Sequence, residues 1–213
     1  MDTQDITVII CCAGMGTRLG IGTTKSLVDI CGKPLIIYQL EQLRNFDDIR
    51  IVVGYQAEKM IEIVNRYRKD IMFAFNHEYE TTGPAASVGK ALMKARKNVI
   101  ILDGDILFHP NEFLEFLEYP DECLAFSDIK SDEPVLMKVK NELVVAFSMN
   151  EGCYEWPGIA KLKRDRICKE NSYVYKMIEA HLPLKGIYVR TRDIDTPDDY
   201  DNAIKWVLNN YID

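Results

Sequence analysis

The stretch from Val8 to Lys25, VIICCAGMGTRLGIGTTK, is the part of this chain that decides its fold. It opens with an apolar run, residues 8–12, of the kind that forms a strand buried on both faces. The chain then turns through Gly14 and Gly16, whose spacing lets backbone N–H groups point toward one place with no Cβ in the way. A buried strand followed by such a loop suits the binding of phosphate oxygens.

Two cations stand beside this loop. Arg18 offers a planar guanidinium fork and Lys25 a point charge. The loop is not a Walker loop, because Thr24 rather than Gly precedes Lys25 and Ser26. It is also a poor dinucleotide fingerprint, because Leu19 stands where a third small residue is needed. The pattern therefore indicates a phosphate site of another kind.

Composition and net charge exclude several classes of protein. With 213 residues, 47% of them hydrophobic and 28% charged, the chain is typical of a soluble protein, and we expect a single domain over residues 1–213. The net charge of −7 argues against binding nucleic acid or an anionic membrane through overall charge. The N-terminus MDTQD lacks the positive segment of a signal peptide, and no apolar run approaches the ~20 residues of a membrane span. We expect a cytoplasmic protein.

Cysteine and histidine patterns give no metal or redox motif. The six cysteines form no C-x-x-C pair, and the three histidines are scattered. Reduced thiols, several of them in the core, are the expected state.

The hydrophobic pattern predicts an α/β fold with a Rossmann-like, mostly parallel central sheet flanked by helices. Buried strands are predicted at 8–12, 49–54, 71–75 and 98–102, and helices at 33–46, 57–67 and 86–95. Shorter strands at 123–127, 135–139, 143–148 and 154–161 predict a small antiparallel lid, inserted at about 123–161, that roofs the cleft and holds a second substrate. A helix at 172–181, a strand at 186–190 and a helix at 198–210 complete the pattern.

Carboxylates follow the fourth buried strand. Asp103, Gly104 and Asp105 come directly after it, and period-2 alternation puts both carboxylates on one side. Because ligands collect at the carboxyl edge of an open α/β sheet, both should point into the cleft. A solvated turn is the structural alternative. Near the C-terminus, Asp195 lies just upstream of a helix that Thr196 and Asp198 would cap.

These motifs together resemble the signature of the nucleotidyltransferases that join an NTP to a phosphorylated small molecule. That signature is an apolar strand, A-G-x-G-T/S-R, a Lys after a short gap, and G-K-P-L. Here it reads Ala13-Gly14-Met15-Gly16-Thr17-Arg18, then Lys25, then Gly32-Lys33-Pro34-Leu35. The chain departs from it at Thr24, where Pro is usual, and at Cys12, where Ala is usual. The I-D-T-x-E/D-D ending of many members matches residues 194–199.

The resemblance implies roles for particular residues. Arg18 and Lys25 would be catalytic, and the metal ligands for Mg²⁺ would be Asp105 and Asp195. The nucleotide would be held by Ala13, Gly14, Met15, Gly16, Thr17, Arg18 and Lys25 of the loop, by Gly83, Pro84, Ala86 and Ser87, and by Asp103 beside the metal. The implied fold is that of the nucleotide-diphospho-sugar transferases. For Ser87, a place near the start of a helix explains the residue equally well.

The acceptor site is predicted from residues 155–161. By the resemblance, this segment faces the acceptor, so Lys161 would meet its phosphate and Trp156 would wall its organic group, through a cation–π contact if the acceptor carries an ammonium. A surface lysine and a core tryptophan stay open as alternatives.

Within that family, the short length and the I-D-T-P-D-D ending most resemble small cytidylyltransferases of the phosphocholine cytidylyltransferase type. This resemblance implies Mg²⁺-dependent transfer of a nucleotidyl group, with CTP as the expected donor. The acceptor would be a phosphocholine-like molecule, another phosphorylated amino compound or a phosphonate, activated for a surface polymer. A sugar-1-phosphate nucleotidyltransferase is the nearest alternative. A non-catalytic nucleotide-binding protein, and a glycosyltransferase that uses Asp103 and Asp105, are alternatives of other classes. The expected partners are thus the NTP and the small acceptor, and the sequence leaves open whether two copies pair as a homodimer.

Overall fold

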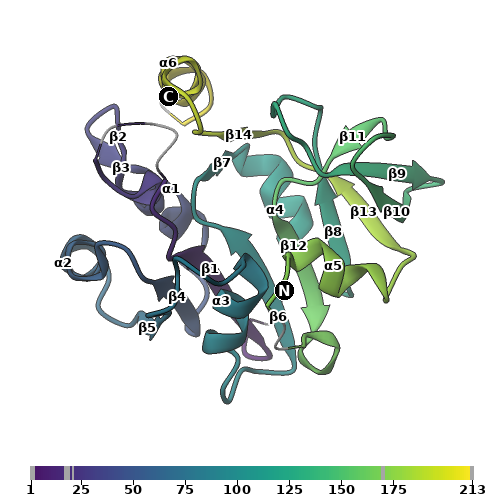
Figure 1. The fold of residues 1–213 in the computed structure, drawn as a ribbon, viewed down its shortest axis with the longest axis horizontal. Coiled ribbons are helices and arrows are strands. Elements are labelled where there is room, and N and C mark those ends of the chain that lie inside the picture. The colour runs from purple at the N-terminus through teal and green to yellow at the C-terminus, as the bar shows by residue number, and fades with distance from the viewer. Residues whose placement is uncertain (1–2, 17–19, 21, 169–170, 212–213) are drawn as a thin grey trace.

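The computed structural model describes residues 3–16, 20, 22–168 and 171–211. Ten strands pair in one sheet, in the order β11-β9-β10-β13-β8-β12-β6-β1-β4-β5 (Figure 1). The strands of this sheet are β1 (Ile6–Cys12), β4 (Ile49–Val53), β5 (Met72–Phe75), β6 (Asn98–Asp103), β8 (Cys123–Phe126), β9 (Leu136–Lys140), β10 (Leu143–Ser148), β11 (Tyr154–Glu155), β12 (Ile159–Lys163) and β13 (Leu184–Tyr188). Two further pairs lie outside it, β2 (Asp29–Ile30) with β3 (Lys33–Pro34) and β7 (Ile106–Phe108) with β14 (Thr191–Asp193).

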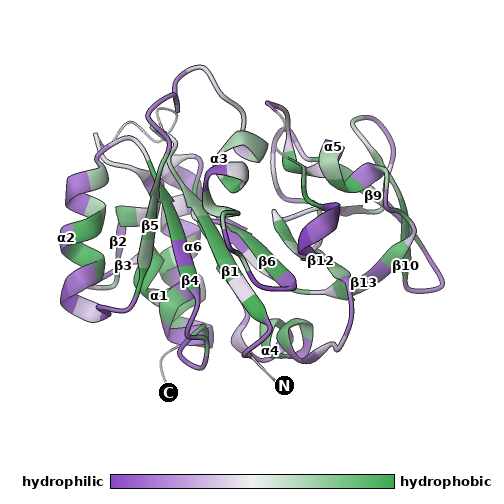
Figure 2. Ribbon diagram, turned by 90° about the horizontal axis from the view of Figure 1, so that it is seen from below, coloured by the Kyte–Doolittle hydropathy of each residue, from purple (hydrophilic) through white to green (hydrophobic). Residues whose placement is uncertain are grey.

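The N-terminal half of the sheet is parallel, as the hydrophobic runs predict. β1 lies between β4 and β6 and pairs with both in parallel. Six of its seven residues are buried, because a strand in the middle of a sheet covered on both faces meets no water. Figure 2 shows the hydrophobic character of β1 and β6. Parallel pairing brings the carboxyl ends of β1 and β6 to one edge, where the loops after them meet.

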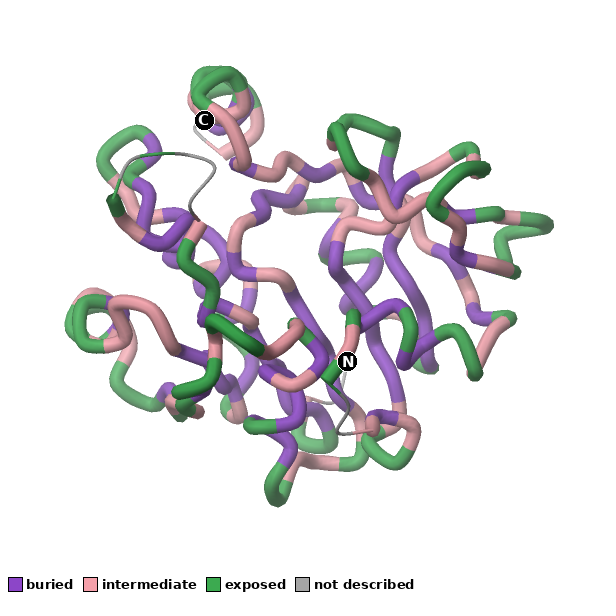
Figure 3. The backbone as a smooth tube through the Cα atoms, in the orientation of Figure 1, coloured by how far each residue is buried: buried purple, intermediate pink, exposed green. Residues whose placement is uncertain are grey.

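The described part of the chain contains six α-helices. They are α1 (Leu35–Gln42), α2 (Ala57–Tyr67), α3 (Pro84–Ala91), α4 (Pro110–Glu118), α5 (Val174–Glu179) and α6 (Pro197–Asn210). Apolar residues of α1, α2 and α4 share one core cluster with β1 and β6, and those of α3 and α5 share another. Because alternate residues of β1 belong to the two clusters, the helices cover both faces of the sheet. Buried residues accordingly follow the strands in Figure 3, and exposed ones the outer loops.

The antiparallel strands continue the main sheet. β12 pairs antiparallel with both β6 and β8, and β9, β10 and β11 extend the sheet beyond β13. The single strand predicted over 154–161 is divided, because Pro157 and Gly158 interrupt it between β11 and β12. Gly158 has φ +75°, a left-handed conformation that β-strands do not contain. This break lets β11 reach the sheet edge while β12 stays beside β6.

Helix α6 packs outside the main sheet. Its Ala203, Trp206 and Val207 form a third core cluster with residues of β2, α1 and β7. A capping box fixes its start, in which the Thr196 hydroxyl accepts from the Asp199 N–H and the Asp199 carboxylate accepts from the Thr196 N–H. The prediction that Thr196 caps the helix is confirmed, but its partner is Asp199 and not Asp198. The cap fixes the chain one residue after Asp195.

No helix among the described residues is long and apolar enough to cross a membrane.

Candidate active site

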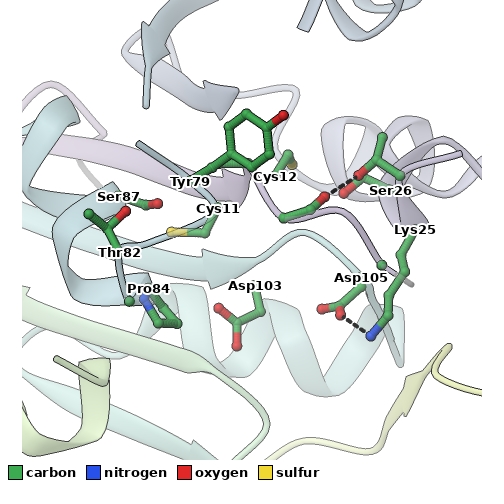
Figure 4. Close-up of a pocket in the computed structure, with 15 residues that line it drawn as sticks. Cys11, Cys12, Lys25, Ser26, Tyr79, Thr82, Pro84, Ser87, Asp103 and Asp105 are labelled. Atoms are coloured by element: carbon green, nitrogen blue, oxygen red, sulfur yellow. Dashed lines mark hydrogen bonds and ion pairs between the residues drawn. The ribbon is translucent and has the colours of Figure 1, made fainter. Parts of the chain in front are cut away.

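A cleft lies at the carboxyl edge of β1 and β6, and we call it the Gly16 cleft. Its volume is about 360 Å³. It is lined by Cys11, Cys12, Ala13, Gly14, Gly16, Thr24, Lys25, Ser26, Tyr79, Thr82, Gly83, Pro84, Ser87, Asp103 and Asp105. The lining comes from the loop after β1, the loop before α3 and the turn after β6 (Figure 4). Three segments far apart in sequence thus form one site, as the sequence predicts for this edge of the sheet.

The loop after β1 packs directly on Lys25. Gly16 has φ +62°, and a Cβ at this position would lie 2.7 Å from Cγ of Lys25. Any larger residue would be strained there and would displace the lysine stem. The Thr24 hydroxyl donates to the Gly14 carbonyl at 3.3 Å, which ties the two ends of the loop together. The loop therefore sets the path of the Lys25 side chain. The predicted Thr17 and Arg18 lie outside the described residues.

Lys25 joins the two carboxylates predicted to bind metal. Its Nζ donates to Asp105 Oδ2 at 2.9 Å and also forms an ion pair with Asp195 (Figure 4 shows the contact with Asp105). The three residues come from the 3-10 helix Lys25–Leu27, the turn after β6 and the segment after β14. Two carboxylates that converge on one cation form an oxygen-rich set that suits Mg²⁺, which takes one or two carboxylates and phosphate oxygens. Among the described residues there is no group of three or more His, Cys, Asp or Glu side chains arranged to hold a metal.

Helix α1 holds the turn that carries Asp105 through hydrogen bonds from Gln39. Gln39 is 1% exposed, and its Nε2 donates to the carbonyls of Asp103 at 2.9 Å and Ile106 at 2.8 Å. The Gly104 N–H donates to the Cys11 carbonyl at 3.0 Å. Gly104 must be small here, since a Cβ would lie 2.8 Å from that carbonyl oxygen. Asp105 is thus displayed on a turn that is clamped at both ends.

Asp103 is the second carboxylate of this turn. Burial and, second, the negative charge of Asp105 raise its pKa to about 8, against the opposing effect of Lys25. In Figure 4 its carboxylate points into the space between Pro84 and Asp105. The protein thus keeps a carboxyl group with a strongly raised pKa next to the Lys25 pair.

A second cleft, which we call the Trp156 cleft, meets the first at Lys25, Asp103 and Asp105. Its volume is about 160 Å³. The rest of its lining is Ile106, Ser131, Glu155, Trp156, Pro157, Gly158, Thr191, Asp193 and Asp195. Trp156 is partly exposed, and its Nε1 donates to the Ile159 carbonyl at 3.2 Å, which fixes the ring. The buried Glu155 carboxylate accepts from the N–H groups of Lys130 and Ser131. This cleft is therefore small, acidic and walled by an aromatic ring.

Lys161 lies elsewhere, and the prediction that it meets the acceptor is wrong. The residue is 4% exposed, and its Nζ donates at 2.7 Å to the carbonyls of Leu117 and Tyr119. These carbonyls end α4, where a cation is favoured by the helix dipole. Along β12 the side chain of Lys161 faces α4 and not the Trp156 cleft. Its role is to satisfy the end of a helix.

Most of the predicted nucleotide residues line the Gly16 cleft. Met15 and Ala86 are not among the described residues that line either cleft, and Met15 is exposed. Ser87 lines the cleft and also accepts from the Asn76 amide at 3.0 Å, so its hydroxyl is anchored.

Sequence reasoning missed several lining residues, namely Cys11, Cys12, Thr24, Ser26, Tyr79 and Thr82 in the first cleft and Ser131, Thr191 and Asp193 in the second. Thr82 and Thr24 adjoin predicted residues and were within reach of the motif. Asp193 stands two residues before Asp195, a spacing that could have indicated a shared face.

Curated relatives match more than half of the chain. The bifunctional protein GlmU of Methanococcus maripaludis is 30% identical over 165 residues, which cover 69% of this chain and 39% of that protein. The mannose-1-phosphate guanyltransferase of Eremothecium gossypii is 32% identical over 127 residues, which cover 55% of this chain and 33% of that protein. The chain thus spans about two fifths or less of the length of these relatives.

Solved structures share the fold over nearly the whole chain. The inositol-1-phosphate CTP transferase of T. maritima aligns with a TM-score of 0.78 at 17% identity, covering 96% of this chain and 97% of that one. The CTP:phosphocholine cytidylyltransferase of Streptococcus pneumoniae aligns with a TM-score of 0.73 at 20% identity, covering 95% and 99%. The predicted nucleotidyltransferase fold is thereby confirmed.

A family model that matches the sequence shows the family of this chain. Residues 8–141, which include the glycine loop, Lys25 and Asp105, match the family model of the MobA-like NTP transferase domain. This match covers more than half of the chain, and it contains all three segments that line the Gly16 cleft. The chain belongs to the family of MobA-like NTP transferase domains.

Proposed function

We propose that this nucleotidyltransferase transfers a nucleotidyl group from an NTP, with CTP as the expected donor, to the phosphate or phosphonate of a small acceptor that carries an amino or quaternary ammonium group. Pyrophosphate is the second product. Mg²⁺ is the proposed cofactor, and Asp105 and Asp195 are its proposed ligands.

One observation carries this proposal. The Gly16 cleft and the Trp156 cleft are separate except where they meet, at Lys25, Asp103 and Asp105. A transferase with two substrates needs two pockets that open on the same reacting group, and the meeting point here holds a cation and carboxylates. The NTP would occupy the larger cleft, with its α-phosphate at Lys25, and the acceptor the smaller one.

The chemistry follows from this arrangement. An acceptor phosphate oxygen, already anionic at neutral pH, attacks the α-phosphorus, and a new P–O bond forms. The bond from the α-phosphorus to the bridging oxygen breaks, and its electron pair leaves with pyrophosphate. Lys25 stabilises the charge that develops on the α-phosphate, and the loop amides hold the phosphates. Bound Mg²⁺ would supply neutralisation of the same charge. No general base is required.

The acidic lining of the Trp156 cleft supports a cationic acceptor group. Asp193 and Trp156 both line it, and a carboxylate beside an aromatic face attracts an ammonium. The volume of about 160 Å³ suits a compact acceptor. A sugar 1-phosphate is the second candidate, because a curated relative is a mannose-1-phosphate guanyltransferase.

The test is pyrophosphate release with Mg²⁺, crossing CTP, UTP, GTP and ATP with phosphocholine, phosphoethanolamine, 2-aminoethylphosphonate and several sugar 1-phosphates. We expect release with CTP and one of the amino acceptors. Asp105→Asn should lose at least 100-fold in turnover while keeping its fold, and Asp132→Asn, an exposed carboxylate outside both clefts, is the matched control. Release only with a sugar 1-phosphate would overturn the acceptor assignment, and full activity of Asp105→Asn would overturn the metal assignment.

A further inference from the structure

A third cleft adjoins the Trp156 cleft at β14, and neither substrate proposed above uses it. Its volume is about 500 Å³, and we call it the Trp206 cleft. It is lined by Lys130, Arg192, Asp193, Asp199, Asn202, Lys205, Trp206 and Asn209. These residues come from the loop before β9, from β14 and from α6, and Figure 1 shows β14 leading into the start of α6. Asp193 is the only residue that the two clefts share in the described part of the chain.

Three cations line this cleft together with two carboxylates, Asp193 and Asp199. Among the described residues, no ion pair joins Lys130, Arg192 or Lys205 to an Asp or Glu. Other cations of this acidic protein, such as Lys138 and Lys185, are paired. Surface lysines are usually explained as part of a solvated, positively charged face. The geometry of two of these residues, Lys130 and Arg192, argues instead for an anion-binding site.

Lys130 and Arg192 are held side by side. Although Lys130 is an exposed residue, its Nζ donates at 3.2 Å to the Ser127 hydroxyl and to the Thr191 carbonyl, both of which belong to buried residues. Arg192 donates to the same Thr191 carbonyl at 2.8 Å, and its guanidinium lies 5.8 Å from the centroid of the Trp206 ring. Burial of its ammonium group and then the charge of Arg192 lower the pKa of Lys130, although the carboxylates of Asp128, Glu155 and Asp193 act in the opposite direction. Two like charges fixed near each other are relieved by an anion between them.

The two carboxylates of the cleft, Asp193 and Asp199, form no ion pair with these cations in the part of the chain that the structure describes, although Asp193 lies near enough to Lys130 to raise its pKa. Asp199 is engaged in the capping box, where it accepts from the Thr196 N–H at 2.9 Å and the Thr196 hydroxyl at 2.8 Å. Asp193 accepts from the Ser131 hydroxyl at 3.1 Å. Both carboxylates therefore hold loops and a helix start in place. The remaining polar groups, the Asn202 and Asn209 carboxamides, can donate hydrogen bonds.

We propose that the Trp206 cleft binds the phosphate group of a small molecule, through Lys130, Arg192 and Lys205. A guanidinium fork with two ammonium groups and carboxamide donors matches the several oxygens and the charge of a phosphate. A volume of about 500 Å³ suits a phosphate ester or a pyrophosphate rather than a polymer. The phosphate can belong to the acceptor, if the acceptor carries a second one, or to a separate effector.

Inorganic pyrophosphate is the probe, and tryptophan emission is the readout. The chain has two tryptophans, so Trp156→Phe leaves Trp206 as the single reporter. In that background we expect a saturable change in Trp206 emission with pyrophosphate at constant ionic strength. Arg192→Gln with Lys205→Gln should weaken the binding at least tenfold. The charge-matched control is Lys138→Gln with Lys176→Gln, on β9 and α5, and it should bind as before.

The absence of any change in Trp206 emission would overturn the proposed site. An equal change in both double variants would also overturn it, because ionic screening or binding in the Gly16 cleft would then explain the change. The KM of the acceptor in the Arg192→Gln, Lys205→Gln protein separates the two sources: a raised KM assigns the phosphate to the acceptor, and an unchanged KM to an effector. The binding measurement needs no turnover, so it stands or fails independently of the proposed reaction.

Discussion

At the scale of single residues, Lys25 is the counter-ion of the site. Its ammonium lies between Asp105 and Asp195, whose side chains are 33% and 21% exposed. Lys25→Met leaves the two negative carboxylates close together without their counter-ion. Without divalent cations we therefore expect the free energy of unfolding to fall by about 1–2 kcal/mol. Added Mg²⁺ should restore more stability to the variant than it adds to the wild type. Urea unfolding in EDTA and in Mg²⁺ measures both effects.

Lys33→Met is the control for this experiment. Lys33 also pairs with a carboxylate, that of Glu41, but with both side chains about one third exposed and far from the clefts. Such a pair contributes little, so its loss should change stability by less than about 1 kcal/mol, with no Mg²⁺ dependence. Equal behaviour of the two variants would contradict the role of Lys25 as a counter-ion.

Asp103 gives the folded protein a pH dependence of known sign. Its pKa in the folded state, about 8, lies above the ordinary value of 3.8, so the folded state binds the proton more tightly. The resulting stability is fully present below about pH 4 and is lost as the pH rises toward 8. In metal-free buffer we expect the free energy of unfolding to fall between pH 5 and pH 8.

Asp103→Asn removes this titration, so the variant should gain stability over the wild type as the pH rises. Urea unfolding in EDTA at pH 5, 6.5 and 8 measures the difference. Asp132→Asn, at an exposed position, should follow the wild-type slope. A wild-type slope in Asp103→Asn would show that another group carries the dependence.

At the scale of elements, α1 positions the turn between β6 and β7. Gln39 is the contact, with two hydrogen bonds to the carbonyls at the ends of the turn. Gln39→Ala leaves both carbonyls without these donors in a buried place, which should cost about 1–3 kcal/mol. Because Asp105 stands on this turn, we also expect the Mg²⁺ concentration for half-maximal activity to rise about tenfold.

The KM of the acceptor should stay unchanged in Gln39→Ala, since a merely unstable enzyme would not shift the Mg²⁺ requirement alone. Gln42→Ala, three residues later on the same helix, has no side-chain hydrogen bond within the described residues and is the control. A lower stability with an unchanged Mg²⁺ requirement would limit Gln39 to a structural role.

Elements with a strong period were predictable, and those that depend on tertiary contacts were not. Apolar residues recur with a helical period in residues 57–67, and helix α2 has those bounds. β7 and β14 are three-residue strands that pair with each other across more than 80 residues of sequence and pack against α1 and α6, so no local pattern reveals them. Lys161 shows the same limit in the site, because its partners on α4 lie more than 40 residues away.

At the scale of the whole molecule, the candidate site was predictable where one motif and one strand end define it. The glycine loop, Lys25 and Asp105 lie together because parallel strands bring their carboxyl ends to one edge. Strands β9 and β10 carry weaker signals, since most of their residues are exposed or half-buried. Asp193 and Ser131 therefore became visible only once β14 and the loop before β9 were placed beside the Trp156 cleft.

The division into two clefts predicts that the two substrates can be perturbed separately. The clefts share only Lys25, Asp103 and Asp105 among the described residues, so changes elsewhere should act on one substrate. Trp156→Leu removes the aromatic wall and should raise the KM of a cationic acceptor about tenfold, since a cation–π contact in a partly closed site contributes about 1–2 kcal/mol. The KM of the NTP should stay within twofold.

Thr82→Val tests the Gly16 cleft, which is proposed to bind the NTP. Thr82 lines only the Gly16 cleft, and its hydroxyl accepts from Asn76 and donates to the Glu78 carbonyl, so the substitution loosens the loop before α3. We expect the KM of the NTP to rise several-fold while that of the acceptor stays unchanged. Initial rates of pyrophosphate release over a grid of both substrate concentrations give the two constants in each variant. If both KM values moved together in both variants, the clefts would act as one pocket, and the assignment of one substrate to each would fail.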